Sequence, residues 1–174
     1  MKTKITGVQI SSWICALLIL AMIVLLFTPY WQYTTKEKNP DTGKREEVTK
    51  TISISDYVWF PRDHKDLAKD YEKTTDLEMS VNDEVTMPIV LLLLGAIGCI
   101  YGAINAKTFV APLATLLLGA YSGMCYASSA FLKMGIGNGC QTRMIVSFAA
   151  AAVGLAGLAV YIISAVAKKK VAAK

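Results

Sequence analysis

Acidic residues are missing from most of this 174-residue chain. All 13 of them lie between Glu37 and Glu84, and every charged residue outside residues 36–84 is basic. Soluble domains mix both signs of charge over their surface, whereas membrane proteins retain basic residues on the cytoplasmic side. The formal net charge of +5 therefore indicates membrane topology, with the lipid bilayer as partner and no nucleic acid.

Cysteine and histidine are scarce, which excludes several kinds of site. The segment 29–87 contains none of the four cysteines, so no disulfide can stabilise it. The single histidine, His64, lacks a second histidine to complete a zinc site and lies among alternating charges typical of a solvated helix face. No EF-hand, phosphate-binding loop or nucleophile elbow occurs either. We expect no metal, no cofactor and no catalytic residue.

Long apolar runs dominate what is present, and 54% of the residues are hydrophobic. About 20 apolar residues are needed to cross the hydrocarbon layer of a bilayer as a helix. The runs predict transmembrane helices at 8–28, 88–106, 109–128 and 144–167. No run has an ionisable residue near its middle, which argues against a pump or a proton-coupled transporter.

The first run has no small-residue cleavage site after it, so we expect an uncleaved helix rather than a signal peptide. It is followed by Tyr30 and Trp31, which we expect to act as interfacial anchors.

Orientation follows from the lysines at the helix ends. Lys2 and Lys4 precede the first run, Lys107 lies between the second and third, and Lys168–Lys170 follow the fourth. With four crossings, all of these lie on one side, which the positive-inside rule makes cytoplasmic. We expect a plasma-membrane protein with both termini in the cytoplasm. Its remaining parts are then a cytoplasmic N-terminus, a large extracytoplasmic domain, a cytoplasmic turn, a short outer loop and a basic cytoplasmic tail, at residues 1–7, 29–87, 107–108, 129–143 and 168–174.

The large outer domain carries strand and turn signals. Residues 44–55 alternate in polarity, and the turn-forming cluster 39–43 separates them from residues 30–38, which predicts a β-hairpin. A short helix is expected over 61–73, and the alternation of Leu77, Met79 and Val81 indicates a third strand. The fold class is thus an all-α four-helix transmembrane bundle with a small extracytoplasmic α+β cap. The expected core or recognition residues of the cap are Trp31, Ile52, Ile54, Tyr57, Trp59 and Phe60.

Small residues recur along the second, third and fourth runs. They allow helices to approach closely within a membrane, where lipid gives no hydrophobic driving force. Packing inside one bundle is the favoured interpretation, and a dimer face is the alternative. The expected helix-packing residues are Gly95, Gly98, Gly102, Gly119, Gly123, Gly154 and Gly157.

The layout resembles the claudin and peripheral myelin protein superfamily. The sequence Pro29-Tyr30-Trp31 after the first run is similar to the Pro-x-Trp that opens the claudin outer sheet. Residues 56–59 end in a Trp near the place of that family's Gly-Leu-Trp, although Phe60-Pro61-Arg62 stands where the family has a cysteine pair. The resemblance implies a tetraspan fold whose outer sheet lacks the family's disulfide.

Three functions are compatible with these features. The first is a non-enzymatic tetraspan interaction or scaffold protein, an accessory subunit that binds another membrane protein or a second copy of itself. The second is a pore or channel formed by an oligomer, with Glu46, Glu47 and Asp56 lining the path. The third is a membrane enzyme acting at the outer face, which would need groups such as Asp56, Asp63 and His64 in one pocket.

Overall fold

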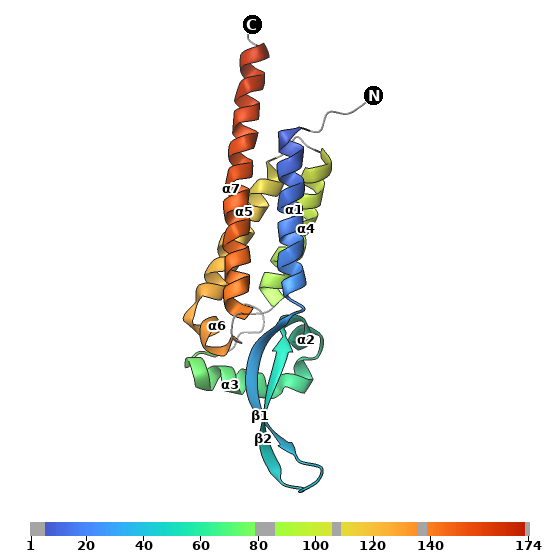
Figure 1. Cartoon of the computed structure of the whole chain (residues 1–174), viewed down its shortest axis with the longest axis vertical. Coiled ribbons are helices and arrows are strands. Elements are labelled where there is room, and N and C mark those ends of the chain that lie inside the picture. Colours follow the sequence, from blue (N-terminus) through green and yellow to red (C-terminus); the bar gives the residue numbers. More distant parts are fainter. Residues whose placement is uncertain (1–5, 79–85, 106–108, 136–138, 173–174) are drawn as a thin grey trace.

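The fold of the chain was analysed in a computed structural model that describes residues 6–78, 86–105, 109–135 and 139–172. A helical bundle forms one end of the molecule and a long β-hairpin the other (Figure 1). The elements are α1 (Gly7–Leu25), β1 (Pro29–Lys38), β2 (Arg45–Ser53), α2 (Ile54–Trp59), η1 (Pro61–His64), α3 (Lys65–Thr75), α4 (Met87–Asn105), α5 (Val110–Ala127), α6 (Ser129–Met134) and α7 (Gly139–Ala172).

Four of these helices, α1, α4, α5 and α7, are long and apolar enough to cross a membrane. They confirm the four long apolar helices expected from the sequence. Helix α1 packs against all three others, α4 packs against α5, and α5 against α7. Helix α1 begins and α7 ends at the end of the bundle remote from the hairpin (Figure 1).

Helix α7 is longer than expected, with 34 residues. It takes in the last five residues of the expected short loop 129–143, and most of the rest of that loop forms α6. Most of the expected short loop is therefore helical, while its residues 136–138 lie outside the described ones. At the other end, α7 continues through Lys168–Lys170 into the expected tail. The start of α1 faces Val160, so about the last 11 residues of α7 project beyond the bundle.

Close backbone approach explains two of the seven glycines. A Cβ on Gly119 would lie 2.5 Å from the amide nitrogen of Ala151 and 2.6 Å from the carbonyl oxygen of Ser147. A Cβ on Gly154 would lie 2.7 Å from the carbonyl oxygen of Pro112. Helices α5 and α7 therefore touch backbone to backbone at both positions, as expected for packing inside one bundle.

Four of the other five glycines face side chains. A Cβ on Gly95, Gly123 or Gly157 would meet the side chains of Leu118, Phe148 and Pro112, respectively. At Gly98, by contrast, the nearest atom lies 3.6 Å away on Val110, an ordinary contact distance. Gly102 is buried in the face of α4.

The expected β-hairpin is confirmed as a two-stranded antiparallel sheet. Its turn depends on Asn39, whose backbone amide donates to Lys44 at 2.8 Å and whose side-chain oxygen accepts from Asp41 at 2.9 Å. Gly43 adopts a φ of 68°, which a residue without Cβ tolerates best. Of the expected third strand, Leu77 is not in a strand, and Met79 and Val81 lie outside the described residues.

The described part of the cap, residues 29–78, folds α3 across β1. The expected helix over 61–73 is present as η1 and α3, and its buried side comprises Leu67 and Tyr71. Helix α2 begins directly after β2, with Ser53 as its N-cap. The backbone amide of Ser55 donates to the carbonyl oxygen of Leu26 at 3.1 Å, which fixes α2 beside the end of α1.

Candidate functional site

The cap and the bundle are joined by a buried arginine at the last position of the expected short outer loop 129–143. Arg143 lies in the second turn of α7 and is 2% exposed. Its Nη2 donates to the carbonyl oxygens of Leu25 at 2.9 Å, Thr28 at 2.8 Å and Pro29 at 3.3 Å, and to the hydroxyl of Thr28 at 2.6 Å. We call this set, with Tyr30, the arginine junction.

An arginine suits this position because of where the carbonyls lie. The last carbonyls of a helix have no intrahelical donor and carry the negative end of the helix dipole. The planar guanidinium presents several donors at once and stacks on aromatic rings. Its carbon Cζ lies 4.4 Å from the centre of the Tyr30 ring. None of the ion pairs found among the described residues involves Arg143, so its partners are neutral.

The aromatic side chains of the cap divide between its interior and its surface. Tyr30 and Trp31, both expected as interfacial anchors and Trp31 also as a core or recognition residue, are fully buried. Trp31 packs edge-on against Tyr57 with ring centres 5.9 Å apart. Trp59 and Phe60, expected as core or recognition residues, are 72% and 59% exposed. The physical reason is that α1 ends at Leu25, so the start of β1 with Tyr30 and Trp31 lies directly below the bundle. Helix α2, in contrast, ends at the edge of the bundle. The other expected core residues, Ile52 and Ile54, are buried.

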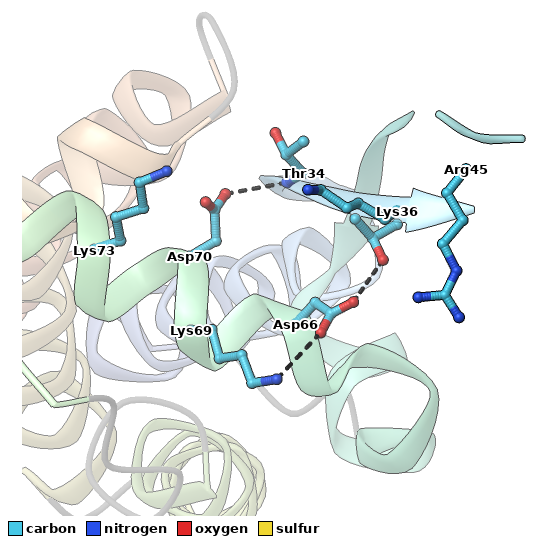
Figure 2. A pocket seen from close by; sticks show the side chains of 8 residues that line it. Thr34, Lys36, Arg45, Asp66, Lys69, Asp70 and Lys73 are labelled. Atoms are coloured by element: carbon cyan, nitrogen blue, oxygen red, sulfur yellow. Dashed lines mark hydrogen bonds and ion pairs between the residues drawn. The ribbon is translucent and has the colours of Figure 1, made fainter. Parts of the chain in front are cut away.

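A polar groove of 360 Å³ lies between β1 and α3 (Figure 2). We call it the cap groove. It is lined by Thr34, Thr35, Lys36, Arg45, Asp66, Lys69, Asp70 and Lys73. Four basic and two acidic side chains therefore face one space, with a formal excess of two positive charges.

Both carboxylates of the cap groove are engaged within the protein. Asp70 accepts from the backbone amide of Thr34 at 3.1 Å, and Asp66 accepts from the hydroxyl of Thr35 (Figure 2). Asp66 also pairs with Lys69 at 3.8 Å. These bonds fix α3 to β1 and give the groove its shape. Arg45 and Lys73 have no side-chain hydrogen bond or ion pair among the described residues, so their charge is available to a ligand.

Of the three carboxylates expected to line a pore, two lie on the β-hairpin and one lies on α2. Glu46 accepts from the side-chain amide of Asn39 at 3.0 Å, and Glu47 lies 3.8 Å from the ammonium of Lys36, both on the hairpin. Asp56 is in the first turn of α2. Each of them thus has a local partner within the chain, and the pore expected between subunits stays a prediction.

The groups considered for catalysis also have local roles. His64 lies with its Nδ1 2.8 Å from the hydroxyl oxygen of Tyr33 and its ring edge-on to the Tyr33 ring. Asp63 precedes it in η1. Within the described ranges, no three His, Cys, Asp or Glu side chains lie close enough together to hold a metal ion.

Asp56 completes a capping box with Ser53. Its carboxylate accepts from the backbone amide of Ser53 at 3.0 Å, and the Ser53 hydroxyl accepts from the amide of Asp56 at 3.1 Å. The bond from the Ser53 backbone amide, and after it a bond from the Ser53 side chain to the carboxylate, hold the pKa of Asp56 below its usual value. The stabilisation is therefore present above about pH 3.9, the ordinary pKa of Asp, and is lost as the pH falls through the lower folded value.

Substitution Asp56→Asn should lower the free energy of unfolding at neutral pH by about 0.5–1 kcal/mol, a modest cap effect because the side chain is exposed. It should also make the free energy of unfolding depend less on pH at acid pH. Thermal unfolding of the purified protein between about pH 3 and pH 7 measures both effects. The exposed Asp63→Asn serves as the control. Equal acid sensitivity of wild type and Asp56→Asn would contradict the assignment.

Comparison with known proteins gives this chain no family: no family model, no curated protein and no solved structure matches it.

Proposed function

We propose that this chain is a non-enzymatic tetraspan interaction protein, an accessory subunit of a larger membrane complex, and that the cap groove receives its partner. The observation that carries the proposal is the cap groove itself, a charged recess fixed on two sides by the bonds from Asp66 and Asp70. A binding surface of this kind loses little conformational entropy when a partner docks.

The arginine junction supports the same function. Arg143 fixes the start of β1 to the end of α1, and the amide of Ser55 bonds to Leu26. The cap is thus tied to the bundle at both ends of its hairpin. A partner bound in the cap groove would therefore be held at a set position relative to the transmembrane helices, as an accessory subunit requires.

The charge of the cap groove indicates the chemistry of the partner. The two carboxylates have internal donors, while Arg45 and Lys73 have none of their own. An acidic segment of a second membrane protein would complement this excess of positive charge. The claudin-like topology is part of the proposal, and the position of Pro29 and Trp31 at the start of β1 supports it.

The test is native extraction in a mild detergent, followed by size determination and mass spectrometry. A larger membrane protein should accompany the wild-type chain in fixed stoichiometry. The double variant Arg45→Glu/Lys73→Glu should weaken that association by about tenfold or more, because two contacts become repulsive.

The matched control is Lys44→Glu/Lys65→Glu, which makes the same change in net charge at exposed positions that do not line the cap groove. It should retain the partner. Recovery of the wild-type chain strictly alone as a monomer would refute the accessory function. Equal retention of the partner by both double variants would refute the role of the cap groove.

A further inference from the structure

Two consecutive aromatic side chains of the cap face outward. Trp59 ends α2 and Phe60 follows it, and they are 72% and 59% exposed. Every other tyrosine or tryptophan of β1 and α2 is buried. The capping box of Ser53 and Asp56 fixes the start of α2, so this exposure belongs to an ordered helix rather than a loose loop. An aromatic pair that is ordered and yet exposed indicates a contact surface.

The position of α2 relative to the bundle identifies what that surface meets. The amide of Ser55 donates to the carbonyl oxygen of Leu26, directly after the last turn of α1. Helix α2 has six residues and is about 9 Å long. Trp59 therefore lies within about 9 Å of the start of α2, where Ser55 bonds to Leu26. Figure 1 shows α2 beside the place where the bundle gives way to the sheet.

Apolar side chains are also exposed where α1 ends and where α4 begins. Phe27, two residues after α1, is 64% exposed, and Met87, the first residue of α4, is 48% exposed. The interfacial layer of a bilayer extends about 5–7 Å beyond the hydrocarbon on each side. Aromatic side chains of membrane proteins collect in this layer. The exposed Arg62 that follows Phe60 can reach lipid phosphates.

We propose that Trp59 and Phe60 insert into the interfacial layer of the leaflet on the cap side, so that α2 attaches the cap to the membrane it stands on. Lipid is the occupant because the bond from Ser55 to Leu26 holds α2 at the end of α1, a helix long and apolar enough to cross a membrane. The cap groove is lined from β1, β2 and α3 alone, so the inference does not depend on the partner proposed for it. It holds for either orientation of the chain in the membrane.

The experiment compares tryptophan fluorescence of the full chain and of Trp59→Phe in lipid nanodiscs. The difference between the two isolates Trp59 from Trp13 in α1 and from the buried Trp31. We expect the Trp59 component to lose most of its intensity when the lipid carries bromine close to the headgroup. Aqueous iodide should quench it weakly.

Two outcomes would overturn the inference. Strong quenching by iodide without quenching by brominated lipid would place Trp59 in water. Protection from both quenchers would show that protein covers it. Trp13→Phe provides the matched control, since it removes a residue of α1 that is 47% exposed on the bundle and should leave the Trp59 component unchanged.

Discussion

Replacement of Arg143 by methionine is expected to lower the free energy of unfolding by about 3 kcal/mol, because it removes charged hydrogen bonds and takes this donor from the carbonyls of Thr28 and Pro29. The carbonyl oxygens of Leu25, Thr28 and Pro29 all accept from the same guanidinium nitrogen. Methionine fills a similar volume, so the loss reports the hydrogen bonds rather than a cavity.

Unfolding of the purified chain in mixed micelles measures the change in stability. Limited trypsin digestion should show in addition that the cap of Arg143→Met is cut while the bundle remains intact. Arg143→Lys should fall between wild type and Arg143→Met, since an ammonium keeps the charge but lacks the planar group that stacks on Tyr30 and donates from its second nitrogen to Gly139.

Lys133→Met is the matched control. Lys133 belongs to α6, the helix just before α7, and is exposed. Its replacement should change stability by less than about 0.5 kcal/mol. If Lys133→Met lowered the free energy of unfolding as much as Arg143→Met, the arginine junction would have no special role in fixing the cap.

Substitution Gly119→Ala or Gly154→Ala should cost about 1–3 kcal/mol, the usual range for overpacking a close-packed contact. The added methyl would meet the backbone of the facing helix, which cannot rotate away as a side chain can. Alanine favours the helix by about 1 kcal/mol relative to glycine, so the measured loss is what remains after that gain.

Gly98→Ala is the control for this pair. Its nearest neighbour would lie at an ordinary contact distance of 3.6 Å, so the helix-propensity gain should make the variant neutral or slightly more stable. Denaturant titration of the three variants in the same micelles ranks them. A loss at Gly98 equal to that at Gly119 would instead indicate that α4 packs against another chain there.

The spans and the hairpin could be predicted because their signals are local. Apolar runs of the right length specify the four helices, and Asn39 with Gly43 specifies the turn. The same local reasoning did not separate the buried aromatic residues from the exposed ones. Residue type alone does not say whether Trp31 or Trp59 faces the interior, because that depends on how far α2 lies from the bundle axis.

The sites depend on residues that are distant in sequence. Arg143 stands at the edge of an apolar run and reads as a loop charge, since its partners lie more than 110 residues earlier. The cap groove is lined from β1, β2 and α3, and no segment of it carries a recognisable motif. Such arrangements follow only from the three-dimensional fold.

The separation between Arg143 and Leu25, 118 residues, also sets an order of assembly. Ribosomes add about 5–20 residues per second, so the end of α1 waits about 6–24 s for its donor after it has been synthesised. The hairpin closes from neighbouring residues and can form within that interval. A chain that stops before α7 would thus carry a folded hairpin next to a helix end whose carbonyls lack the Arg143 donor. That region would be open to proteases until biosynthesis is complete.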